Sequence, residues 1–117
     1  MRHRKKGKKL HRKRDERLAL KRILAVNLIK RKRIYTTKAK AKELQRFIER
    51  LITLAKKGDL AHYRLIISRL GNKEAAKELY QKIAPKYKER KGGYTRIIKT
   101  SKATKKDGSF LSLIEFV

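Results

Sequence analysis

The middle of the chain reads TKAKAKELQRFIERLITLAKKG from Thr37 to Gly58. Its apolar residues recur at the i, i+3, i+4, i+7 spacing of a single helix face. They are Leu44, Phe47, Ile48, Leu51, Ile52 and Ala55. Thr37 is a suitable N-cap, and Gly58 stands where a helix end favours a left-handed residue. The stretch therefore predicts a long helix with one buried face.

Two more helices are predicted downstream. Asp59 can cap the first, Gly71-Asn72 can end it and start the second, and Pro85 should end that one. Their apolar positions are Leu60, Ala61, Leu65, Ile66 and Leu70, then Ala76, Leu79, Tyr80 and Ile83. The spacing again predicts one buried face for each helix.

Upstream, an amphipathic helix is predicted from about Arg17 to Lys30. The acidic pair Asp15-Glu16 suits its first turn, where negative charge complements the helix dipole. Its apolar stripe would consist of Leu20, Ile23, Leu24 and Leu28. The segment Ile34-Tyr35-Thr36-Thr37 is rich in β-formers and predicts a strand.

The last third of the chain predicts two strands, residues 94–100 and 110–117, joined through the turn-forming Lys106-Asp107-Gly108-Ser109. With the early strand beside them, the order becomes α-β-α-α-α-β-β. We therefore expect an α+β fold, a single two-layer domain over residues 15–117 with a small mixed three-stranded sheet. The alternating Ile, Leu and Phe of the final strand would suit a sheet edge to which another chain could add.

The net charge is +27 on 117 residues, from 37 Lys and Arg against ten Asp and Glu. Such a chain repels itself, so we expect a polyanionic partner. Nucleic acid is the expected one, because each neutralised phosphate releases counterions. No apolar run approaches the ~20 residues of a membrane span, and the N-terminus lacks the apolar stretch of a secretory signal. Without cysteine there is neither a disulfide nor Cys-ligated zinc.

Residues 1–14 form a basic N-terminal arm with nine Lys or Arg and no acid. Such a segment cannot bury enough surface to fold alone, so it is expected to be disordered without RNA. Its arginines can hold phosphates bidentately and its lysines act as point charges. The expected RNA contacts are Arg2, His3, Arg4, Lys5, Lys6, Lys8, Lys9, Arg12, Lys13 and Arg14. His3 and His11 lack metal-ligand spacing, so no metal site is expected.

Two further segments are candidate RNA contacts. Thr36, Thr37, Lys38, Lys40 and Lys42 surround a predicted helix N-terminus, whose free N–H groups attract phosphate. The alternative is that Thr37 only caps the helix and the lysines are solvated. In Gly92-Gly93-Tyr94-Thr95-Arg96, Tyr94 could stack on a base and Arg96 could bind phosphate. The alternative there is a turn leading into a strand with a half-buried tyrosine.

An enzyme is not expected. The sequence has no P-loop, no Gly-rich dinucleotide turn and no acidic cluster for Mg²⁺, so no cofactor or small-molecule substrate is expected either. Charge alone leaves two interpretations open. One is a structural ribosomal protein, and the other is a free nucleoid-associated or RNA-chaperone protein that coats nucleic acid without a fixed site.

Several stretches resemble one family from end to end. They are Met1–Leu10, Arg33–Thr37 with Lys40–Leu44, Leu51–Lys56, Gly92–Ile97 and Leu113–Val117. In this order they resemble the bacterial large-subunit ribosomal protein seventeen family. One departure is Arg14-Asp15-Glu16, where the family often has a polar run such as Ser-Ser-His.

The resemblance implies a non-catalytic component of the large subunit, located in the cytoplasm within the ribosome. Family members bind the large rRNA around the exit of the nascent-peptide tunnel, beside other ribosomal proteins and away from membranes. The resemblance also extends to the arm and the Thr36-Thr37-x-x-Lys40-Ala41-Lys42 segment, which it implies are rRNA contacts.

Overall fold

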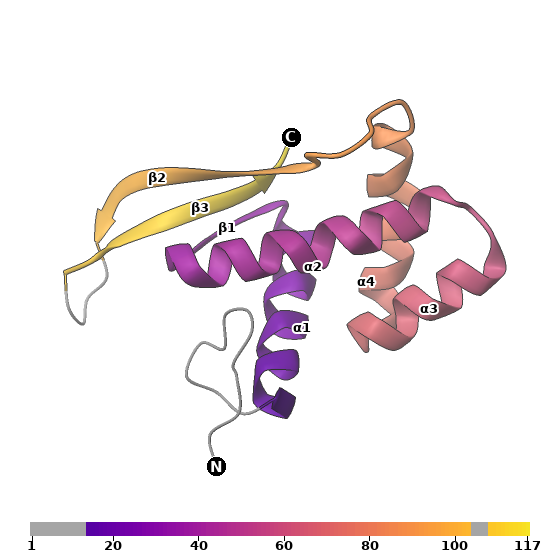
Figure 1. Ribbon diagram of the computed structural model, residues 1–117, viewed down its shortest axis with the longest axis horizontal. Coiled ribbons are helices and arrows are strands. Elements are labelled where there is room, and N and C mark those ends of the chain that lie inside the picture. The colour runs from indigo at the N-terminus through magenta and orange to yellow at the C-terminus, as the bar shows by residue number, and fades with distance from the viewer. Residues whose placement is uncertain (1–13, 104–107) are drawn as a thin grey trace, which may run out of the picture.

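The computed structural model describes residues 14–103 and 108–117. The elements of the described chain are α1 (Arg14–Arg31), β1 (Arg33–Thr36), α2 (Lys38–Lys56), α3 (Leu60–Leu70), α4 (Lys73–Glu78), a π-helical turn η1 (Leu79–Ile83), a 3-10 turn η2 (Ala84–Tyr87), β2 (Thr95–Ala103) and β3 (Phe110–Phe116) (Figure 1). The predicted α+β class and element order are confirmed. No helix in this part of the chain is both long and apolar enough to cross a membrane.

The three strands form one sheet in the order β1-β3-β2. Both neighbouring pairs are antiparallel, so the prediction of a mixed sheet is wrong. The early strand does join the late pair as expected. However, it pairs with β3, which therefore lies at the centre. The prediction that the final strand forms a free edge is wrong, because β3 is hydrogen-bonded on both sides.

The helices and the sheet make two layers, and α2 lies directly against the sheet (Figure 1). Ile34 of β1, Ile114 of β3 and Ile97 of β2 stand opposite one another in the register, so they share one face. Ile114 is fully buried against the helices. Burial of this isoleucine row joins the sheet to the helical layer.

Helix α2 has the buried face that its spacing predicts. Its fully or nearly fully buried apolar residues are Ala41, Leu44, Ile48, Leu51, Ile52 and Ala55. The Thr37 side chain accepts a hydrogen bond from the Lys40 N–H at 3.3 Å, as an N-cap should. Gly58 follows the helix with a φ of +73°, a conformation that favours glycine.

The predicted caps of the next two helices are also confirmed. Asp59 accepts from the His62 N–H at 2.8 Å, and Asn72 accepts from the Ala75 N–H at 2.9 Å. Pro85, however, does not end the helical path. The α-helix changes to the π-helical turn η1 before Pro85, and the chain then continues through the 3-10 turn η2. The change occurs because proline cannot donate an α-helical hydrogen bond and its ring would clash with the carbonyl four residues earlier.

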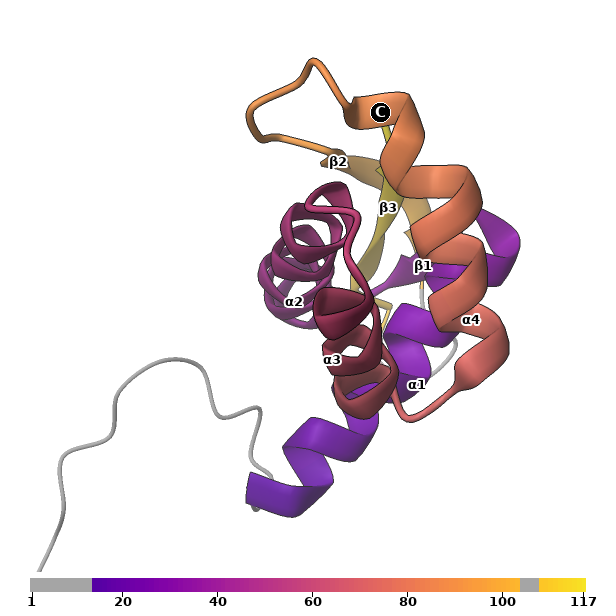
Figure 2. The same ribbon diagram turned by 90° about the vertical axis from the view of Figure 1, so that its right-hand side faces the viewer.

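The predicted apolar stripe of α1 is partly wrong. Ile23 is 59% exposed, whereas Ala25, Leu28 and Ile29 are fully buried. The N-terminal turns of α1 extend past the other helices, so only its C-terminal half meets the core (Figure 2). Leu60 and Leu65 of α3 are likewise exposed, because no element of the described chain covers them.

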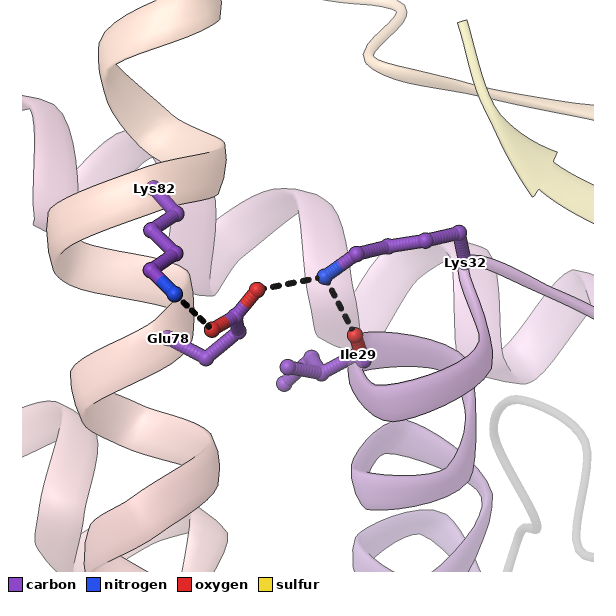
Figure 3. A network of polar contacts seen from close by, with 4 residues as sticks. All are labelled: Ile29, Lys32, Glu78 and Lys82. Atoms are coloured by element: carbon purple, nitrogen blue, oxygen red, sulfur yellow. Dashed lines mark hydrogen bonds and ion pairs between the residues drawn. The ribbon is translucent and has the colours of Figure 1, made fainter.

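Lys32 joins α1 to α4. It has a φ of +71°, which is rare for a residue with a Cβ, and it directs the chain from α1 into β1. Its ammonium donates to the Ile29 carbonyl at 2.8 Å and to the Glu78 carboxylate at 2.7 Å (Figure 3). Lys82 approaches the other oxygen of Glu78 at 3.6 Å. The hydrogen bond from Lys32 lowers the pKa of Glu78 below its ordinary value.

Glu78→Gln should therefore destabilise the fold at neutral pH by roughly 0.5–1 kcal/mol, since the pair is partly exposed to solvent. The pKa of Glu78 lies below its ordinary value of 4.5 in the folded state. Its contribution is thus complete above that value and is lost as the pH falls through the folded-state pKa. Urea unfolding at about pH 7 and about pH 3 would measure this.

The matched control is Glu89→Gln, which removes an exposed carboxylate. It should leave the free energy of unfolding within about 0.5 kcal/mol of the parent. If Glu78→Gln lowered the free energy of unfolding as much at about pH 3 as at about pH 7, the role assigned to the ion pair would be contradicted.

Candidate nucleic-acid interface

Most of the predicted arm contacts, from Arg2 to Lys13, lie outside the described residues. The exception is Arg14. It is the first residue of α1 and is exposed, so α1 starts one residue inside the predicted arm.

The Thr36–Lys42 segment forms the turn from β1 into α2. Lys38 and Lys42 are exposed, four residues apart, and Lys40 is half-buried. The first N–H groups of a helix have no intrahelical partner, and Thr37 occupies that of Lys40. Thr36 differs from the prediction. It is only 8% exposed, because its strand position faces the helical layer, so little of its side chain is accessible to an RNA phosphate.

Tyr94 is buried, and the prediction that it stacks on a base is wrong. It is 2% exposed and packs against Tyr87, with the ring centroids 5.3 Å apart. Its hydroxyl accepts a hydrogen bond from the Lys56 ammonium at 2.9 Å and donates to the Arg90 carbonyl at 3.3 Å. Burial also raises the pKa of Tyr87, whose hydroxyl donates to the Val117 backbone oxygen at 2.7 Å. Both tyrosines therefore hold the C-terminal strands to the helices.

Arg96 is exposed on β2 but does not stand alone. Its guanidinium contacts the Glu115 carboxylate on β3 at 2.6 and 2.7 Å, and the two residues are paired in the register. The pair spans neighbouring strands and balances the charge of Arg96. Contact of Arg96 with phosphate stays a prediction.

A cationic cleft that the sequence did not suggest lies where α1, α2 and α3 meet. It has a volume of about 550 Å³. Its cations are Arg14, Lys21 and Arg22 of α1, Arg50 of α2 and Arg69 of α3. Apolar side chains also line it, namely Leu18, Phe47 and Leu51. Ser68 completes the lining, and we call these nine residues the α1–α3 cleft.

Two cations of the α1–α3 cleft have structural partners. Arg22 donates to the backbone carbonyls of Arg69 at 2.9 Å and Ser68 at 3.2 Å, so it caps the C-terminal end of α3. Lys21 lies 3.7 Å from Glu43. Within the described ranges, no carboxylate pairs with Arg14, Arg50 or Arg69. These three arginines therefore give the cleft an uncompensated positive charge.

A weak signal for the cleft was present in the sequence. Arg14, Leu18, Lys21 and Arg22 follow helical spacing, and so do Phe47, Arg50 and Leu51. The first set lies on a helix face that looks solvated when read alone. Only the packing of three helices brings the two sets together.

The outer face of the sheet carries a different kind of surface. Tyr35, Leu113 and Ile98 stand opposite one another across the strands, and Tyr35 and Ile98 are 49% and 41% exposed. The Lys102 ammonium lies 4.4 Å from the centre of the Tyr35 ring. This apolar row contrasts with the cationic surface around the helices.

Comparison with known proteins matches residues 20–117 to the family model for ribosomal protein L17. The chain belongs to the ribosomal protein L17 family. The resemblance found in the sequence is thereby confirmed.

Relatives of this L17-family chain match over its whole length, including the arm. A protein of Hydrogenobaculum is 49% identical over 117 residues, covering all of this chain and 99% of its own length. A protein of Thermus thermophilus is 46% identical over the same length, again with 99% of its own chain covered. A protein of Fusobacterium nucleatum is 46% identical and covered completely. Each is named large ribosomal subunit protein bL17.

Tyr94→Phe tests the structural role of this tyrosine in the L17-family chain. Loss of the hydroxyl removes its hydrogen bonds with the Lys56 ammonium and the Arg90 carbonyl, which still bond to each other, so stability should fall by about 1 kcal/mol. Affinity for RNA should stay within about twofold, because a buried ring cannot stack on a base. Thermal unfolding and RNA filter binding would measure the two effects. Tyr35→Phe, at an exposed ring, is the control and should change neither.

Proposed function

We propose that this chain is a structural constituent of the large ribosomal subunit that binds and stabilises its large rRNA, near the nascent-peptide tunnel exit, without catalysis. The observation that carries the proposal is the full-length identity of 46–49% with relatives named large ribosomal subunit proteins. The net charge of +27 supports RNA as the partner, because a chain so cationic gains most from phosphate.

The proposed contacts divide between the arm and the folded domain. The arm supplies arginines and lysines that can follow the rRNA backbone, and it would order on binding. On the domain, the exposed lysines Lys38 and Lys42 flank the start of α2, where Thr37 already caps the helix. A phosphate there would meet both ammonium groups and the helix dipole. Such contacts position a protein on RNA without reading its sequence.

Neighbouring large-subunit proteins are the other proposed partners, within the ribosome of the cytoplasm. The exposed Tyr35 and Ile98, on either side of buried Leu113, support protein contact, because apolar side chains gain little from phosphate. The proposal includes no membrane partner, cofactor or small-molecule substrate.

Removal of residues 1–13 should weaken association with large subunits and reduce its salt dependence. Eight lysines and arginines are lost, and each phosphate contact contributes roughly 0.7–0.9 to the slope of log K against log salt. Sucrose gradients run over a range of salt concentrations would measure the change. A full-length chain with glutamine at those eight positions separates charge from length and should behave like the truncated chain.

Two results would count against the proposal in different ways. An unchanged affinity and salt slope in both variants would remove the arm from the interface. If the parent chain stayed in the light fractions at low salt, it would be a free nucleic-acid-coating protein instead.

A further inference from the structure

We propose that the α1–α3 cleft binds one unpaired nucleotide of RNA. The phosphate would contact Arg14, Arg50 and Arg69, and the base would lie against Leu18 and Phe47. This inference rests on the proposed function, because it assigns a specific site to the RNA-binding role. It goes beyond that role, since it distinguishes an extruded nucleotide from a duplex backbone.

The three arginines meet the requirements of a phosphate site. They come from three different helices, are exposed, and converge on one cleft. Guanidinium groups hold phosphate oxygens through paired N–H donors, so three of them can fix an oxyanion from several sides. Among the described residues that line the cleft, none is acidic. The arginines repel one another, so a bound anion would stabilise the site.

The lining of the cleft explains why the anion would carry a base. Leu18 is 40% exposed, and half-buried Phe47 borders the same space. Neither water nor free phosphate would bury the apolar side chains that lie exposed among these arginines. A nucleotide has a flat apolar base within one ribose of its phosphate, so it can cover the lining while the arginines hold the charge. The volume of about 550 Å³ lies within the usual range for small-ligand sites.

The cleft wall is built before a ligand arrives. Arg22 hydrogen-bonds the last carbonyls of α3, and Gly71 ends that helix with a φ of +68°, a conformation that favours glycine. These bonds hold the C-terminal end of α3 against α1. A preformed wall reduces the entropy lost on binding.

RNA fits the cleft better than an acidic peptide does. The cleft begins at Arg14, directly after the basic arm, so a strand held by the arm can continue into it. An acidic side chain would satisfy the arginines but would leave Leu18 and Phe47 uncovered. The arm itself would be repelled by the like charge of the cleft.

The test compares two variants of the full chain that lose the same charge. The cleft variant is Arg50→Gln with Arg69→Gln, and the control is Lys73→Gln with Lys77→Gln on α4, outside the cleft. Fluorescence anisotropy measures binding to a labelled single-stranded RNA and to an RNA duplex of equal length, over a range of salt concentrations. Circular dichroism establishes that both variants are folded.

We expect the cleft variant to bind single-stranded RNA at least about tenfold more weakly than the control, with a salt slope lower than the parent's by roughly 1.4 for two lost phosphate contacts. The duplex should lose affinity equally in both variants, because its bases are not free to enter the cleft. Equal losses for single-stranded RNA in the two variants would overturn the proposal. If the parent binds neither RNA, the proposed function fails first.

Phe47→Leu tests the base contact without changing the charge. The substitution keeps a smaller apolar side chain at a half-buried position, so the fold should be retained, and circular dichroism would check this. Single-stranded RNA should bind at least about fivefold more weakly, with the salt slope unchanged. Unchanged binding would overturn the nucleotide site. Displacement of the single-stranded RNA by a poly-glutamate peptide at equal concentration would also overturn it, in favour of an acidic protein partner.

Discussion

Burial of the apolar face of α2 is the constraint on which the remaining structure depends. A chain of +27 tends to expand through its own repulsion, so a continuous apolar core has to outweigh that tendency. Helix α2 supplies the core because it contacts α1, α3, η1, η2, β2 and β3. Its buried row from Ala41 to Ala55 is the surface against which those elements are placed. The positions of the cationic side chains on the helices follow from this packing.

The few acidic residues are used to join elements. Glu49 of α2 accepts hydrogen bonds from the backbone and hydroxyl of Thr95 at 3.2 and 2.9 Å, which fixes the start of β2. Glu78 joins α4 to the end of α1, and Glu115 joins β3 to β2. Glu43, buried on α2, meets Lys21 of α1. Because these four carboxylates are engaged within the fold, they do not offset exposed cations such as Arg50 and Arg69.

The cationic surface has two parts with different physical character. Exposed lysines at the start of α2 act as point charges, which suit a passing phosphate backbone. The α1–α3 cleft instead combines arginines with apolar side chains in a concave site, which suits a ligand that is anionic on one side and apolar on the other. The proposed arm leads into the cleft at Arg14. A single RNA strand could thus contact the cations of residues 1–13 and the preformed site in turn.

The sequence by itself determined the local features, because they depend on residues a few positions apart. The α2 periodicity, the caps at Thr37, Asp59 and Asn72 and the family resemblance were all predicted and confirmed. The tertiary structure alone decided which strand is central, the burial of Tyr94 and Thr36, and the assembly of the cleft. These depend on contacts between segments far apart in the chain. Helical spacing tells which residues share a face, but only the packing of one face against another determines whether it meets the core, a neighbouring arginine or solvent.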